Sequence, residues 1–77
     1  MASLTEELIS VLTEEQDVYR ELIPISEQKT KVIIQNDLKS LQEITEREQQ
    51  AVEKLNMLER RREEVVVNMG TVLNRDP

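Results

Sequence analysis

Acidic side chains are the residues of this chain whose type and spacing could support chemistry. They cluster as pairs at Glu6-Glu7, Glu14-Glu15, Glu46 with Glu48, and Glu63-Glu64. Paired carboxylates can act as general acid and base or bind cations, but the chain has no His and no Cys to complete a catalytic or zinc site. Di-iron bundle sites also need Glu-x-x-His pairs. The acidic pairs therefore indicate a solvated helix surface, and we predict no enzymatic activity, no metal and no cofactor.

The densest basic segment is Arg60–Arg62, and acidic residues flank it at Glu59, Glu63 and Glu64. Mixed charges of this kind are typical of the exposed side of a helix. We interpret the segment as such a surface, with one arginine turned toward Glu15. A docking patch for an acidic partner is the alternative interpretation.

The chain carries 16 acidic and 10 basic residues, which gives a net charge of −6 at pH 7. This sign repels phosphate backbones and anionic lipids, so we expect no nucleic acid as partner and no membrane insertion. The longest apolar runs have three residues, far below the roughly 20 that a transmembrane helix needs. The sequence starts without a signal-peptide pattern and lacks Cys, and we therefore predict a cytoplasmic protein.

Apolar residues at helical spacing are the other feature of the sequence that could bind a partner protein. A first helix over about 4–35 is predicted to begin at the capping box Ser3-Leu-Thr-Glu6. Its apolar stripe has polar interruptions at Glu15 and Lys29, and Ile9, Leu12, Tyr19, Ile23 and Ile33 widen it toward a further neighbour. The residues of the stripe itself are Leu4, Leu8, Val11, Val18, Leu22, Ile25 and Val32.

Pro24 interrupts this first helix. Its ring removes the N–H that would bond the carbonyl of Arg20, at a cost of about 3 kcal/mol in a helix interior. The apolar stripe keeps its spacing on both sides of the proline, which favours a kink. A break near Ile23 into two shorter helices is the alternative.

Asn36-Asp37 is predicted to form a tight turn, since Asn tolerates a left-handed conformation and Asp is a good helix N-cap. A second helix over about 38–73 follows. Its predicted stripe is Leu38, Leu41, Val52, Leu55, Val66, Met69 and Leu73, with polar layers at Thr45, Glu48, Glu59 and Arg62. The chain over 1–77 is thus predicted to be all-α, a single antiparallel two-helix coiled-coil hairpin.

The polar interruptions of the two stripes test this hairpin. When the chain is folded at the turn, Glu15 lies within reach of Arg61 or Arg62. Lys29 then lies within reach of Glu48, so that each pair joins opposite charges. The register of the hairpin is therefore predicted by charge as well as by spacing.

A two-helix hairpin buries one stripe and leaves the flanking apolar residues exposed. We expect it to complete a three- or four-helix bundle with another helix, with a second copy as a homodimer, or with a client protein. The client-binding residues are predicted at the open end, where Met can adapt to different partners. They are Val65, Val66, Met69, Val72 and Leu73, with Leu4, Leu8 and Leu12 as neighbours across the hairpin.

Four segments of the chain resemble the FlgN family of bacterial flagellar export chaperones. They span residues 22–29, 32–38, 44–50 and 55–62, and the similarity as a whole covers about residues 4–68. The resemblance implies a cytoplasmic helical protein that binds the hook-associated proteins FlgK and FlgL. It would keep them soluble and deliver them to the flagellar type III secretion apparatus. In this family, clients bind mainly to a helical region beyond the hairpin, whereas little sequence follows Val67 here. Pro24 is a second departure from the family pattern.

Overall fold

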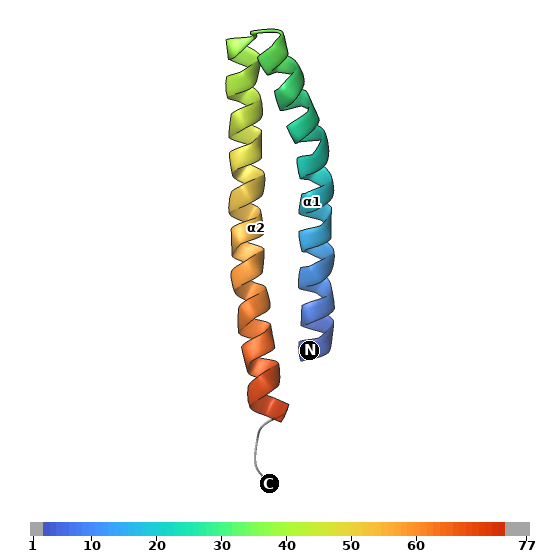
Figure 1. Cartoon of the computed structure of the whole chain (residues 1–77). Coiled ribbons are helices and arrows are strands. Elements are labelled where there is room, and N and C mark those ends of the chain that lie inside the picture. The colour runs from blue at the N-terminus through green and yellow to red at the C-terminus, as the bar shows by residue number, and fades with distance from the viewer. Residues whose placement is uncertain (1–2, 74–77) are drawn as a thin grey trace.

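The computed structural model describes residues 3–73, which form two long helices that lie side by side and run in opposite directions (Figure 1). Helix α1 spans Leu4–Ile34 and helix α2 spans Leu38–Leu73. The predicted all-α antiparallel hairpin is therefore confirmed. No strand occurs within residues 3–73.

Ser3 starts α1. Its backbone is extended, with φ −72 and ψ 165, and its hydroxyl accepts a hydrogen bond of 3.1 Å from the N–H of Glu6. This bond satisfies one of the backbone donors that a helix leaves free at its N-terminus. Glu6 and Glu7 place negative charge in the first turn, where the helix dipole favours it.

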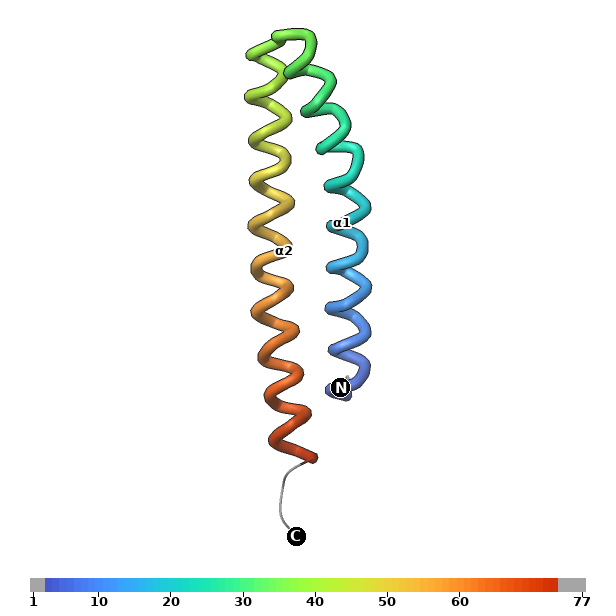
Figure 2. Tube along the Cα trace, in the orientation of Figure 1, coloured from blue at the N-terminus to red at the C-terminus, as the bar shows by residue number. Residues whose placement is uncertain are grey.

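Helix α1 continues through Pro24 as one helix. In Figure 2 the trace of α1 bends toward α2 over its last turns. A proline inside a helix leaves one carbonyl without its intrahelical donor and so permits such a bend. The bend brings the C-terminal end of α1 to the turn.

The turn between the helices rests on Asn36, which has a φ of 57, in the left-handed region. The N–H groups of Asn36 and Asp37 donate to the carbonyls of Ile33 and Val32, each at 3.1 Å. The Asp37 carboxylate then caps α2, because it accepts from the hydroxyl of Ser40 at 2.7 Å and from its N–H at 3.1 Å. The hydroxyl and then the N–H of Ser40 lower the pKa of Asp37.

Residues at intervals of seven form the buried centre between the helices. They are Val11, Val18 and Ile25 on α1, and Ile44, Ala51, Leu58 and Val65 on α2. A seven-residue repeat is typical of helices that pack along their length as a coiled coil. With the polar and half-buried residues between them, these positions define the seam: Leu4, Leu8, Val11, Glu15, Val18, Leu22, Ile25, Lys29 and Val32 on α1, and Leu41, Ile44, Glu48, Ala51, Leu55, Leu58, Arg62, Val65 and Met69 on α2.

The stripe predicted for α1 agrees with the seam, but the stripe predicted for α2 is partly wrong. Leu41, Leu55 and Met69 are half-buried as expected, whereas Val52 and Val66 are exposed. Leu38 and Leu73 are also exposed, with 72% and 80% of their surface open. The buried positions are one residue earlier, at Ala51 and Val65. The predicted stripe did not include Ala51, which is 5% exposed in the structure.

Candidate protein-binding surface

Two ion pairs cross the seam and fix how the helices align. The Lys29 Nζ lies 3.0 Å from the Glu48 Oε1, and the Arg62 Nε lies 3.3 Å from the Glu15 Oε1. Both pairs were predicted from the interruptions of the apolar stripes. With the register fixed, each long side of the hairpin has a defined set of residues.

Glu15 is the buried member of these pairs, with 6% of its surface exposed, whereas Arg62 is partly open to solvent. The Glu15 Oε1 has no hydrogen-bond partner within residues 3–73, although Arg62 approaches to 3.3 Å. We attribute the missing hydrogen bond to the angle between the Arg62 N–H and the Glu15 oxygen, since a short distance alone does not make a hydrogen bond. The contact is therefore electrostatic, and a buried pair of this kind contributes more to register than to stability.

The geometry of the helix divides the rest of the hairpin into two flanks. Each residue turns a helix by 100°, so residues one position after the seam lie on one side and residues one position before it lie on the other. Because α1 and α2 run in opposite directions, the residues after the seam on both helices share the same long side. The residues before the seam share the opposite side.

The charged flank consists of residues that precede seam positions. Arg47 and Gln28 both belong to it, and the Arg47 Nη2 donates to the Gln28 Oε1 at 3.4 Å, which shows that the two helices meet on this side. The charged residues of this flank are mainly acidic on α1 and mainly basic on α2. The charged members are Glu7, Glu14, Asp17, Glu21 and Lys31 on α1, and Glu43, Arg47, Lys54, Arg61 and Glu64 on α2.

The apolar flank consists of residues that follow seam positions. On α1 none of them is charged: Thr5, Ile9, Leu12, Gln16, Tyr19, Ile23, Ser26, Thr30 and Ile33. On α2 it includes Thr45, Val52 and Val66, and its charged members are Glu59 and Glu63. Leu38 and Leu73, seven residues before Thr45 and after Val66, extend the flank past the ends of the seam. The apolar members are open to solvent, with half of Tyr19 and 60% of Ile23 exposed. Near the turn, Ile33 and Leu38 line one groove, which shows that the two helices also meet on this side.

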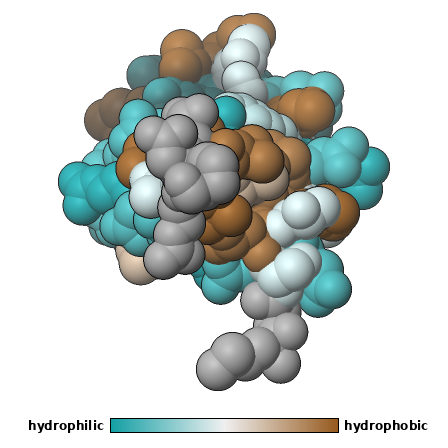
Figure 3. All heavy atoms as spheres, turned by 90° about the horizontal axis from the view of Figure 1, so that it is seen from below, coloured by the Kyte–Doolittle hydropathy of each residue, from teal (hydrophilic) through white to brown (hydrophobic). Residues whose placement is uncertain are grey.

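The open end of the hairpin carries a shallow groove lined by Leu4, Thr5, Met69, Val72 and Leu73. Figure 3, seen from this end, shows a patch of apolar side chains near the centre of the face. Four of the predicted client-binding residues thus come together here. Their role in binding stays a prediction.

The other predicted client-binding residues lie elsewhere. Val65 is buried in the seam with 4% of its surface exposed, so a partner cannot contact much of it. Leu8 is a half-buried seam residue. Leu12 and Val66 lie on the apolar flank, with 45% and 51% exposed. Sequence reasoning recognised the α1 half of the apolar flank, since its apolar residues were predicted to widen the stripe toward a further neighbour, but it missed the α2 half.

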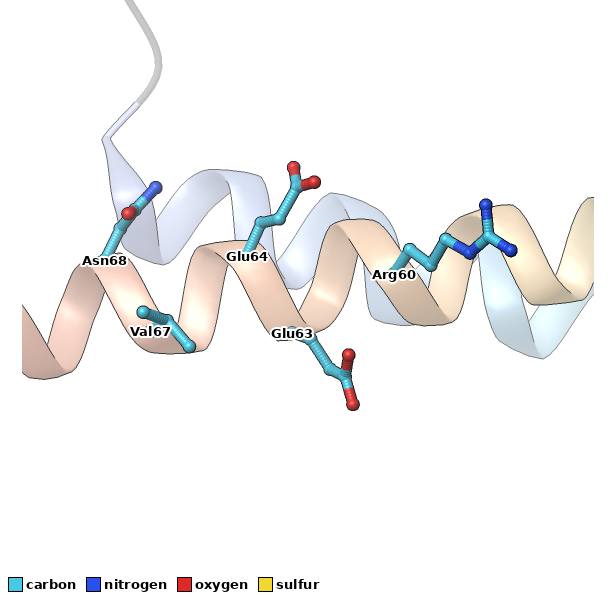
Figure 4. A pocket seen from close by; sticks show the side chains of 5 residues that line it. All are labelled: Arg60, Glu63, Glu64, Val67 and Asn68. Carbon is cyan, nitrogen blue, oxygen red and sulfur yellow. The ribbon is translucent and has the colours of Figure 1, made fainter.

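The outer side of α2 has a depression lined by Arg60, Glu63, Glu64, Val67 and Asn68. Figure 4 shows that all five side chains come from this one helix, and that Glu63 and Glu64 point in different directions. They do not converge on a point where a reacting group could be held. Within residues 3–73, no group of three or more His, Cys, Asp or Glu is placed to hold a metal ion.

The chain was compared with known protein families, curated proteins and solved structures. The FlgN family model, described as FlgN protein, matches residues 1–77. The chain belongs to the FlgN family. Neither a curated protein nor a solved structure matches it. The family match covers the whole chain and therefore includes Pro24. In the described part of this FlgN-family chain, neither helix is long and apolar enough to cross a membrane.

Proposed function

We propose that the chain is a cytoplasmic flagellar export chaperone that binds hook-associated proteins of the FlgK and FlgL type. It keeps them soluble and delivers them to the flagellar type III secretion apparatus. Membership of the FlgN family supports this function. The observation that carries it is the exposed apolar surface, along one flank and at the open end, of a hairpin that is otherwise acidic.

The mechanism is binding without chemistry. An amphipathic segment of a client lays its apolar side against the aliphatic surface of the hairpin, which hides that side from other copies of the client. The net charge of −6 keeps the complex soluble. Neither ATP nor a cofactor takes part, and the protein is not an enzyme.

The open end is the proposed client contact. Leu4, Met69, Val72 and Leu73 share one groove there, which supports a joint role. Val66 and Leu12 extend this surface onto the apolar flank. Val65 and Leu8 support it from within the seam and are not expected to touch the client extensively.

Purified chain and a FlgK-type hook-associated protein test the proposal directly. Isothermal titration calorimetry should detect a one-to-one complex, and light scattering should report the summed mass of the two proteins. Val66→Asp and Met69→Asp should weaken binding while circular dichroism stays helical. If both variants fold and bind like the wild type, the open-end contact is wrong. If the wild type does not bind, the chaperone function is wrong.

A homodimeric four-helix bundle without client binding is the second candidate. A compact monomer of this mass, 9.0 kDa, exposes about 4,900 Å² by the usual scaling, whereas this chain exposes 6307 Å². A second copy on the apolar flank would remove much of that excess. A stable dimer that ignores hook-associated proteins would favour this function.

A further inference from the structure

We infer that the apolar flank binds one amphipathic helix of the client, which lies along the hairpin as a third helix. The helix carries an aliphatic stripe and places a basic side chain against Glu59 and Glu63. This inference rests on the proposed chaperone function, and it extends the client contact from the open end along the length of the hairpin.

The exposed apolar side chains are concentrated on one long side of the hairpin. Most of the large ones that the structure describes belong to the apolar flank: Ile9, Leu12, Tyr19, Ile23, Ile33, Leu38, Val52, Val66 and Leu73. Ile34, Met57, Val67 and Val72 are as exposed but lie on other sides of the two helices. A random scatter of exposed apolar residues would not leave one long side almost free of charge.

The apolar flank is also long enough to hold a client helix. From Ile9 to Ile33, α1 rises about 36 Å, since a helix rises about 1.5 Å per residue. That length accommodates a client helix of roughly six turns. The flank has apolar side chains from α1 on one edge and from α2 on the other, and a helix packs between two such ridges.

The acidic residues on the apolar flank favour a client helix over a second copy of the chain. Glu59 and Glu63 are one helical turn apart on the α2 edge of the flank, and neither has an ion-pair partner within residues 3–73. Arg62, between them in sequence, pairs with Glu15 instead. A second copy of the chain would bring the same two carboxylates and no base on its apolar flank. A client helix with Lys or Arg beside its aliphatic stripe matches both features.

Two variants with the same charge change test the apolar part of the inference. Ile23→Glu places a carboxylate on the apolar flank, whereas Met57→Glu places one at a position that is similarly exposed, 70% against 60%. Both residues are exposed, so both variants should stay helical by circular dichroism. Binding of a purified FlgK-type hook-associated protein should weaken about tenfold or more with Ile23→Glu and less than about twofold with Met57→Glu.

A charge reversal tests the basic residue of the client. The double variant Glu59→Lys, Glu63→Lys should weaken binding about three- to tenfold at low salt and less at high salt, because salt screens exposed charges. A third measurement, the mass of each free protein by light scattering, distinguishes a client from a second copy.

The outcomes separate the inference from the proposed function. Loss of binding with Ile23→Glu but not with Met57→Glu supports the inference. If the wild type binds but Ile23→Glu binds equally well, the chaperone function stands and the flank is not the site. A wild-type dimer that Ile23→Glu converts to a monomer, with client binding unchanged, also overturns the inference. If the wild type does not bind the hook-associated protein, the proposed function itself is wrong.

Discussion

The two flanks of this hairpin differ although the same two helices build both. The charged flank carries charged residues from both helices, and the Arg47 side chain donates a hydrogen bond to Gln28 across it. The apolar flank has side chains such as Tyr19 and Ile23, which are exposed and contact solvent. Charged side chains on one long side of the hairpin are therefore solvated, whereas the apolar side chains on the other are left for a partner.

The seam separates the two flanks, and adjacent residues should therefore respond differently to the same change. Val18 is 1% exposed, whereas its neighbour Tyr19 is 50% exposed. Val18→Asp should destabilise the hairpin by roughly 3–5 kcal/mol, because it buries an unpaired charge. Tyr19→Asp should cost less than about 1 kcal/mol, as is usual at exposed positions. Thermal unfolding followed by circular dichroism measures both, and equal effects would contradict the assignment of seam and flank.

The buried Glu15–Arg62 pair should give an asymmetric result. Arg62→Met leaves the Glu15 carboxylate buried and unpaired, so it should destabilise the protein by about 1–3 kcal/mol. Glu15→Leu removes the buried charge and leaves Arg62, which is partly exposed, in water. This variant should be neutral or more stable. Urea unfolding of the two variants measures the difference, and a Glu15→Leu variant that is the less stable of the two would show that the pair itself stabilises the fold.

On the charged flank, Arg47→Glu should have a small effect. It removes the hydrogen bond to Gln28, which is 3.4 Å long and exposed, so stability should fall by less than about 1 kcal/mol. The loss should shrink further at high salt because exposed charges are screened. Binding of a hook-associated protein should not change. Weaker binding by a folded Arg47→Glu protein would place the client on this flank and reverse the comparison.

The last prediction concerns the turn, which belongs to neither flank. Ser40 lowers the pKa of Asp37 below its ordinary value of 3.8 in the folded protein. The capping contribution is therefore complete above pH 3.8 and fades as the pH falls through the lowered pKa. Thermal midpoints of wild type and Asp37→Ala, measured between pH 6 and pH 2, about the range where Asp titrates, should converge at the acidic end. A constant difference over this range would contradict the cap.

Much of the fold could be predicted because several signals agreed. Ser3 and Glu6 predicted the start of α1, Asn36 and Asp37 predicted the turn, and the opposite charges at polar stripe positions predicted the register. Each of these signals is local or depends on a charge, so it can be recognised in the sequence.

The α2 stripe and the surface could be predicted less well. Ala51 and Val52 are adjacent, both apolar and both at helical spacing from Leu55, so spacing alone did not decide between them. An error of one residue turns the stripe by 100°, which moved Val52 and Val66 from the flank into the predicted core. The α2 half of the apolar flank was missed for this reason, because it requires the correct seam on that helix. The family of the chain was predicted correctly from its segments.

The most direct test of the central claim is a map of the client contact by NMR. Backbone amide shifts of the isotope-labelled chain would be recorded before and after addition of an unlabelled FlgK-type hook-associated protein. We predict that the largest changes fall on the apolar flank, at residues such as Tyr19, Ile23 and Val52, while Lys54 and Met57 change little. Changes concentrated on the charged flank, or confined to Leu4, Met69 and Val72 at the open end, would contradict the claim that the apolar flank receives the client.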